Sequence, residues 1–189
     1  TNDNGASIYV RDKISNILTV QNDLASNSIR CIAEDEQGNY YIGTSDALSI
    51  VTISNGLKVR KTLQEIMYAR SIAIGKAGDV AVVNNSGQLF IINNQMIKET
   101  FTLKTGNAET FYTCCKYMDN GDLLVGTTTN EMYRLRKTNG KYRTIKRYTT
   151  GNLQQISSIA SDDQGNYWVC SGSGIGYLQR EKFHTFDTN

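Results

Sequence analysis

Short apolar segments recur along the whole chain, and each follows a polar turn that ends in glycine. The segment Asn39–Thr44 after Gly38 has counterparts after Gly121 and Gly165, and a weaker copy follows Gly78. The four glycines are 40, 43 and 44 residues apart. This spacing is typical of four-stranded propeller blades and is longer than an ankyrin or leucine-rich repeat. The pattern therefore predicts a repetitive, all-β chain.

Within each repeat, polar and apolar residues alternate with the period of two that characterises strands. The glycine that ends each first turn supplies the positive φ that the chain needs before it re-enters a sheet. Four strands per repeat are expected, and they are predicted at Ile29–Glu34, Asn39–Gly43, Leu48–Ile53 and Leu57–Leu63; Arg70–Ile74, Asp79–Val83, Gln88–Ile92 and Met96–Leu103; Phe111–Tyr117, Asp122–Gly126, Glu131–Arg136 and Tyr142–Tyr148; Ile156–Ser161, Asn166–Cys170, Ile175–Gln179 and Phe183–Phe186.

The start of the chain fits only the outer half of a repeat, because its inner pair of strands is missing. Closed propellers have about four to eight blades and protect their sheet edges by closure. The predicted fold is an all-β β-propeller built of four-stranded antiparallel blades, here about four and a half blades of a larger propeller. The expected division of this single segment, 1–189, is an outer half-blade at 5–21 and blades at 22–63, 64–105, 106–150 and 151–187.

Composition excludes several classes of protein. Hydrophobic residues make up 39% of the 189 residues, which is enough for a buried core, and a net charge of +2 gives no domain-wide attraction for nucleic acid. The apolar runs are too short to span a bilayer, and the first residues lack the pattern of a signal peptide. We expect any export signal or membrane anchor to lie outside this sequence, and no cofactor is indicated.

The four cysteines do not form a metal-binding pattern. Cys31, Cys114, Cys115 and Cys170 contain no Cys-x-x-Cys pair, and the chain has one histidine. Adjacent Cys114 and Cys115 should point to opposite faces of a strand. We predict free thiols packed as small apolar residues.

The segment from Asn22 to Thr44 resembles the two-component regulator propeller repeat. It contains an asparagine and an aliphatic residue that open the inner strand, then Asp-x-x-Gly at Asp35–Gly38, an aromatic residue and Ile42-Gly43-Thr44. The last repeat matches as well, with Trp168 where the family favours tryptophan. The two middle repeats depart from the pattern, since Ala81 and Leu124 replace the aromatic residue.

The resemblance implies an extracytoplasmic sensor in a bacterial membrane-bound signalling receptor that signals through a histidine kinase or a diguanylate cyclase. Members of the family in gut bacteria include carbohydrate sensors, so a carbohydrate or another small polar ligand is expected. The implied protein is not an enzyme. Two alternatives are a protein-interaction scaffold without a small ligand and a propeller hydrolase or lyase. Shared fold does not establish shared function.

Candidate ligand-binding residues lie where the chain enters the inner strands. Arg30 and Arg70 both stand eight residues before their anchor glycines, so they should point the same way and bind a carboxylate, a sulfate or sugar hydroxyls. The adjoining loops, Asn22–Asn27, Met67-Tyr68, Glu109–Tyr112 and Asn152–Gln155, offer amide and aromatic groups suited to sugars. The predicted ligand-binding residues are Arg30, Arg70, Tyr68, Asn27, Tyr112 and Gln154.

Other polar features fit structural roles better. His184 has no catalytic partner placed by a motif, and the acidic turns at Glu34–Glu36 and Asp162-Asp163 lack the ligand order of a calcium loop. One outer hairpin is basic, and it either binds a polyanion or, as we favour, keeps a sheet edge from pairing; its cations are Arg134, Arg136, Lys137, Lys141, Arg143, Lys146 and Arg147. Open blade faces should promote self-association.

Overall fold

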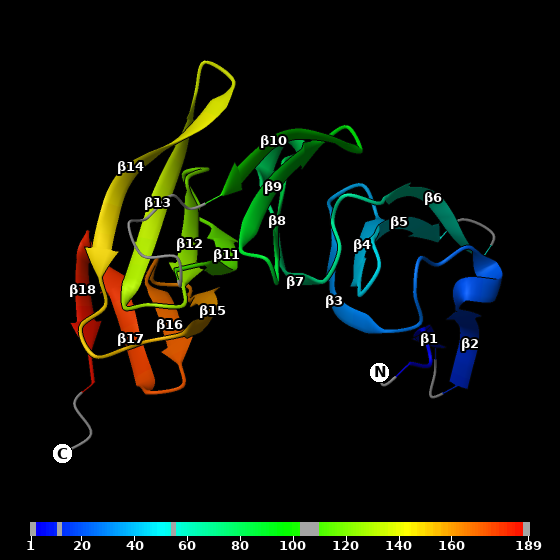
Figure 1. Ribbon diagram of the computed structural model, residues 1–189, viewed down its shortest axis with the longest axis horizontal. Helices are drawn as coiled ribbons and strands as arrows, with labels where there is room; N and C mark the ends of the chain where they lie inside the picture. Colours follow the sequence, from blue (N-terminus) through cyan, green and yellow to red (C-terminus); the bar gives the residue numbers. More distant parts are fainter. Residues whose placement is uncertain (1–2, 11–12, 54–55, 103–109, 187–189) are drawn as a thin grey trace.

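The protein is an arc of β-sheets placed side by side (Figure 1). The computed structural model describes residues 3–10, 13–53, 56–102 and 110–186. Within these ranges four sheets have four strands each and one sheet has two, and the helical content is limited to two 3-10 turns. No helix among them is long and apolar enough to cross a membrane.

Each four-stranded sheet is formed by consecutive strands, and we call these sheets blades. The two-stranded half-blade comprises β1 (Ala6–Val10) and β2 (Lys13–Leu18). The four blades that follow are blade 1, with β3 (Ile29–Glu34), β4 (Asn39–Thr44), β5 (Leu48–Ile53) and β6 (Leu57–Leu63); blade 2, with β7 (Ala69–Ile74), β8 (Val80–Asn84), β9 (Gln88–Asn93) and β10 (Met96–Thr102); blade 3, with β11 (Tyr112–Tyr117), β12 (Leu123–Thr127), β13 (Glu131–Thr138) and β14 (Lys141–Thr149); and blade 4, with β15 (Ile156–Ser161), β16 (Tyr167–Ser171), β17 (Gly174–Gln179) and β18 (Lys182–Thr185).

All strand pairs are antiparallel, and the first strand of every blade is an edge strand. These four inner strands, β3, β7, β11 and β15, lie next to one another along the concave side of the arc (Figure 1). The prediction of four-stranded antiparallel propeller blades with an outer half-blade at the start is confirmed. Leu103 and Glu109, which were predicted to end a strand and to begin a loop, lie outside the described residues, as does the boundary between 105 and 106.

Neighbouring sheets pack face to face, and each junction has its own apolar cluster. Burial of apolar surface is the main force that holds such layers together. Representative pairs across the successive junctions are Leu18 with Ile42, Ile50 with Val82, Ile91 with Leu123, and Met132 with Val169. Second strands in the middle of the arc are buried on both faces, which explains the unbroken apolar run Val80–Val83.

Two glycines let neighbouring blades approach closely. A Cβ atom built on Gly43 would lie 2.6 Å from the Ala69 Cβ, and one built on Gly126 would lie 2.6 Å from the Ile156 Cγ2. Both glycines occupy the same repeat position, and each faces the inner strand of the following blade. The Gly in the Ile-Gly-Thr motif is therefore required for the spacing between blades.

Aspartates in the first turns hold those turns together. The Asp35 carboxylate accepts hydrogen bonds from the backbone N–H groups of Gln37 and Asn39, at 3.0 and 2.8 Å. Asp162 accepts the equivalent bonds from Gln164 and Asn166. Among the described residues, no group of three metal-ligating side chains is present. In these two acidic turns the aspartates fix the backbone through hydrogen bonds of the Asx-turn kind.

The cysteines are free thiols, as predicted. Cys114 packs in the cluster between blades 3 and 4, and Cys115 packs in the cluster between blades 2 and 3, so they do point to opposite faces. The prediction that all four pack as apolar residues was wrong for Cys170, which is exposed. Its position corresponds to Gly43 and Gly126, but no sheet among the described residues covers that face of blade 4.

The uncovered face of blade 4 carries large apolar side chains. Ile175 and Phe186 are 48% and 54% exposed. By sheet register Ile175 corresponds to Leu48 and Met132, which are fully buried against the next blade. The ring of Phe186 stacks on Trp168 at 5.9 Å between centroids. This face therefore has the composition of an interface between blades.

Substitution of Gly126 by alanine should destabilise the fold, because the new Cβ would overlap Ile156 and the Cys114 sulfur. We expect a loss of about 1 to 3 kcal/mol in the free energy of unfolding, measured by urea denaturation. The control is Gly172→Ala, whose Cβ would meet no atom within 4 Å and should change stability by no more than about 0.5 kcal/mol. Equal stability of the two variants would contradict close packing at this junction.

Candidate functional site

Each inner strand contains a β-bulge at the same repeat position. The pairing register skips one residue in β3, β7, β11 and β15, and the skipped residues are Arg30, Arg70, Thr113 and Ser157. All four stand eight residues before an anchor glycine. A bulge re-aims the side chain of the extra residue and is common beside binding sites. The two predicted arginines are therefore bulge residues of adjacent inner strands.

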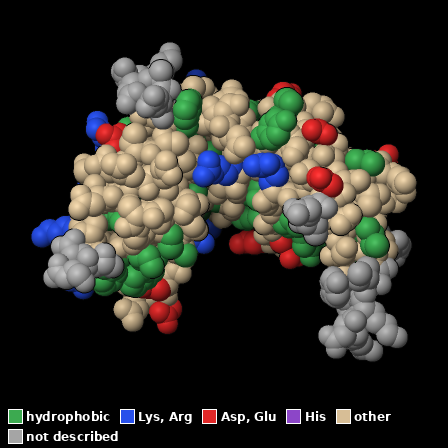
Figure 2. Space-filling model, turned by 60° about the horizontal axis from the view of Figure 1, so that its bottom comes forward, with side chains coloured by type: hydrophobic (Ala, Val, Ile, Leu, Met, Phe, Trp, Pro, Cys, Tyr) green, Lys and Arg blue, Asp and Glu red, His purple; other side chains and the backbone are tan. Residues whose placement is uncertain are grey.

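A cavity of about 500 Å³ lies between the four inner strands. Its lining includes Arg70, Ser71, Lys116, Ser157 and Ser158, together with thiols and isoleucine side chains. We call it the axial cavity. The space-filling view shows the hollow between the two arms of the arc, with Lys and Arg side chains beside it (Figure 2). The volume is in the range of small-molecule sites, about 300–1,000 Å³.

The structure brings Arg30 and Tyr68 together across the junction of blades 1 and 2. The Arg30 Cζ lies 5.8 Å from the centroid of the Tyr68 ring, which is within range of a cation–π interaction. Both side chains are exposed; the Tyr68 residue is 45% exposed. Arg70 follows Tyr68 by two residues and lines the axial cavity. These three residues form one cluster on the face where the chain enters the inner strands, which we call the loop face.

The backbone of Tyr68 is strained. Its φ is 51°, in the left-handed region that a bulky residue rarely adopts. The Tyr68 N–H donates to the Ser45 carbonyl at 3.0 Å, and the Tyr68 carbonyl accepts from the Asn85 N–H at 3.0 Å. Loops of two blades thus fix a conformation that costs about 1–3 kcal/mol. Strain of this kind clusters at binding sites, and here it presents an exposed aromatic ring.

Three other predicted residues are placed differently. Asn27 is half-buried, and its side-chain oxygen accepts a hydrogen bond from the Val20 N–H at 2.8 Å. Gln154 is exposed, and its backbone N–H donates to the Ser173 hydroxyl at 3.1 Å. Tyr112 is 5% exposed and packs edge-to-face on Tyr133. The structure therefore does not bring these three into the cluster of Arg30, Tyr68 and Arg70.

Sequence reasoning missed two residues of the loop face and the axial cavity. Phe111 is 42% exposed and stands ten residues before its anchor glycine, as Tyr68 does. It packs on the turn at Gly87, where an added Cβ would lie 2.6 Å from the Phe111 Cβ. Lys116 lines the axial cavity from β11. The shared offset from the glycine would have identified Phe111, whereas nothing in the repeat marks Lys116.

Most cations of the basic outer hairpin of blade 3 form ion pairs with acidic residues of the same blade or of the neighbouring blades. Among the described residues, five of its seven cations form ion pairs, namely Arg134, Arg136, Lys137, Lys146 and Arg147. Lys137 reaches Asp79 of blade 2 at 2.7 Å. Lys141 and Arg143 form no ion pair in the described part of the chain. Fewer of the hairpin's positive charges are therefore available to bind a polyanion than its sequence indicates.

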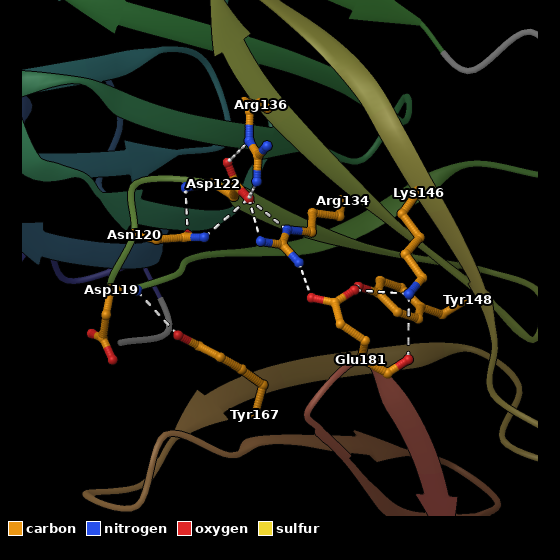
Figure 3. A network of polar contacts seen from close by, with 9 residues as sticks. All are labelled: Asp119, Asn120, Asp122, Arg134, Arg136, Lys146, Tyr148, Tyr167 and Glu181. Atoms are coloured by element: carbon orange, nitrogen blue, oxygen red, sulfur yellow. Dashed lines mark hydrogen bonds and ion pairs between the residues drawn. The ribbon is translucent and has the colours of Figure 1, made fainter.

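Glu181 is the centre of the contact between blades 3 and 4 (Figure 3). This residue belongs to the turn between β17 and β18, and its carboxylate accepts hydrogen bonds from Lys146 and Tyr148, each at 2.8 Å. Arg134 pairs with Glu181 and also with Asp122 of its own blade. The hydrogen bond from Lys146, with those from Tyr148 and Arg134, lowers the pKa of Glu181 to about 2.

His184 lies on the last strand, away from the axial cavity. Its ring stacks on Tyr177 at 4.9 Å between centroids. Within the described residues, the imidazole makes no ion pair and no hydrogen bond. The arrangement is that of an exposed packing residue.

Comparison with protein families gives a match within the first full repeat. Residues 23–46 match the family described as two component regulator propeller. The chain therefore carries a repeat of the two-component regulator propeller family, as the residues from Asn22 to Thr44 predict. A search of curated protein sequences gives no match.

Several solved propellers are similar in structure. The extracellular domain assigned to a hybrid two component system of B. thetaiotaomicron matches with a TM-score of 0.67 and 20% identity, over 84% of this chain and 23% of that one. The WD40 beta propeller domain of Doa1 matches with a TM-score of 0.71 and 18% identity, over 95% of this chain and 58% of that one. Virginiamycin B lyase from Staphylococcus aureus matches with a TM-score of 0.67 and 14% identity, over 84% of this chain and 55% of that one. At these identities the similarity shows the propeller fold, and the chain spans between 23% and 58% of these relatives.

The pairs around Glu181 make stability depend on pH. Because the pKa of Glu181 is lowered from 4.5 to about 2 in the folded protein, its contribution is complete above about pH 4.5 and is lost as the pH falls through about 2. Glu181→Gln should remove this part of the pH dependence in urea unfolding. The side chain is 47% exposed, so solvent screening limits the gap between wild type and variant to about 1 kcal/mol.

The matched control is Glu65→Gln, because Glu65 is exposed and forms no ion pair in the described part of the chain. It should leave the pH dependence unchanged. A gap between wild type and Glu181→Gln that stays constant from neutral to acidic pH would refute the assignment.

Proposed function

We propose that this chain is a ligand-sensing segment of an extracytoplasmic propeller in a membrane-bound bacterial signalling receptor of the histidine kinase or diguanylate cyclase type. Its ligand is a carbohydrate or another small polar molecule, bound at the loop face. The family repeat at residues 23–46 supports the class of protein. The similarity to an extracellular domain of a two component system agrees with this location, although that similarity itself extends only to the fold.

One observation carries the proposal of a binding site. Arg30 and Tyr68 meet at the junction of two blades on a strained and bulged backbone, and Arg70, two residues after Tyr68, lines the axial cavity. An exposed aromatic ring stacks on a sugar ring, and guanidinium groups donate to its hydroxyl or acidic groups. A ligand bound there transmits a signal if it binds one arrangement of the receptor more tightly than another.

We propose a binding function without catalysis. The stacking of His184 on Tyr177, far from the axial cavity, supports this, because the sequence contains no other histidine. Lyases and WD40 domains share the fold, so the hydrolase or lyase and the scaffold without a small ligand remain the alternatives. Turnover of a bound saccharide would favour the enzyme.

Tyr68→Gly tests the site because it removes the ring and relieves the left-handed strain at once. We expect saccharide binding on a glycan array to be lost, while the free energy of unfolding stays within about 1 kcal/mol of wild type. Asn94→Gly relieves a similar left-handed residue, at φ 51°, in the turn between β9 and β10. It should leave binding unchanged. Full binding by Tyr68→Gly would contradict a ligand site at the loop face.

We also propose that the uncovered face of blade 4 is covered in the working protein, either by another blade or by a second copy of the chain. The 189-residue chain alone should then self-associate, as measured by light scattering over a range of concentrations. Ile175→Glu should weaken the association, because Ile175 is 48% exposed on that face. Ile145→Glu, at a 45% exposed residue of β14, is the control. A monomer at every concentration would argue against this interface.

A further inference from the structure

Three cations without an acidic partner lie at or beside the axial cavity. On the outer hairpin of blade 3, most Lys and Arg side chains pair with Asp or Glu. Arg30, Arg70 and Lys116 form no ion pair in the described part of the chain, although they come from three neighbouring blades. Arg70 and Lys116 line the cavity, and Arg30 lies beside it in the bulge of β3.

The cavity contains no group that would neutralise this positive charge. Neither Asp nor Glu is among its lining residues. Burial raises the pKa of the Cys31 and Cys114 thiols to about 11, and that of Cys115 to about 12. These thiols are therefore neutral at physiological pH. The remaining polar groups are the hydroxyls of Ser71, Ser157 and Ser158, which carry no charge.

We propose that the axial cavity binds the anionic group of its ligand, a carboxylate or sulfate carried by an acidic saccharide. This inference rests on the proposed function, because it assumes that the ligand binds at the loop face. Arg70 is a bulge residue and lines the cavity, and a guanidinium donates two parallel hydrogen bonds to a carboxylate or sulfate. Arg30 and Lys116 add positive charge on either side.

The same arrangement accounts for the neutral part of such a ligand. The exposed ring of Tyr68 lies next to Arg30, two residues before Arg70, where a sugar ring can stack. Serine hydroxyls inside the cavity donate to or accept from sugar hydroxyls. A neutral sugar would leave the cations of three blades without a counter-charge, whereas the anionic group of an acidic sugar supplies one. Charge complementarity therefore selects the acidic ligand.

The experiment compares acidic saccharides with their neutral counterparts, using the intact protein and isothermal titration calorimetry. One pair is a uronic acid oligosaccharide and its methyl ester, and the other is a sulfated disaccharide and its desulfated form. We expect one acidic member to bind at least about tenfold more tightly than its neutral counterpart, which is the range for a hydrogen bond to a charged group. The affinity should fall as ionic strength rises. The pair that responds distinguishes a carboxylate from a sulfate.

Variants test the assigned residue. Arg70→Gln should weaken binding of the acidic member by about tenfold or more, and Arg70→Lys should be intermediate because lysine keeps the charge but loses the bidentate geometry. Arg143→Gln removes one charge from an exposed position on the outer hairpin and should have no effect.

Equal affinity for both members of each pair, or unchanged affinity in Arg70→Gln, would overturn the inference. If neutral saccharides bind equally well and Tyr68→Gly abolishes that binding, the inference fails while the proposed function stands. If no saccharide of either kind binds, both fail.

Discussion

Face-to-face packing of the blades is the constraint on which the rest of the structure depends. Each junction buries apolar side chains from two sheets, and Gly43 and Gly126 allow the following inner strand to approach. Because every blade repeats this packing, the four inner strands come together along the concave side of the arc. The axial cavity is a result of this packing, and two of the four bulge residues, Arg70 and Ser157, line it.

This packing also divides the charged residues into two groups. Outer strands and the turns at Asp79, Asp122 and Glu181 carry charges that pair across or within blades, so they hold the sheets together. The inner strands carry Arg30 and Arg70, which have no acidic partner in the described residues. A basic stretch in the sequence is therefore largely neutralised, whereas the two isolated arginines of the inner strands keep their charge without an acidic partner in the described residues. In the proposed function, recognition and assembly use different parts of the same blades.

The sequence predicts the strands well because alternation and anchor glycines are local signals. β3 and β5 have the predicted bounds, and β11 starts one residue later than expected. The equal spacing of Arg30 and Arg70 from their glycines also predicts that they are neighbours. The sequence does not predict the bulge in each inner strand. A bulge arises when the pairing register skips a residue, and that register depends on the neighbouring strand. Likewise, Phe111 and Tyr112 are both aromatic, and only the packing decides which one is buried.

Ion pairs between residues far apart in the chain cannot be predicted from the local sequence pattern. Glu181 and Arg134 are 47 residues apart and meet only after two blades have packed. Cys170 is exposed because no sheet among the described residues covers its face of blade 4, and the residues around it do not reveal this.

The central claim, that ligand recognition belongs to the bulged inner strands, is tested most directly by hydrogen–deuterium exchange of the intact protein with a saccharide that binds it. The account predicts slower exchange at residues 28–31 and 67–71, whereas slower exchange confined to the outer strands would contradict it.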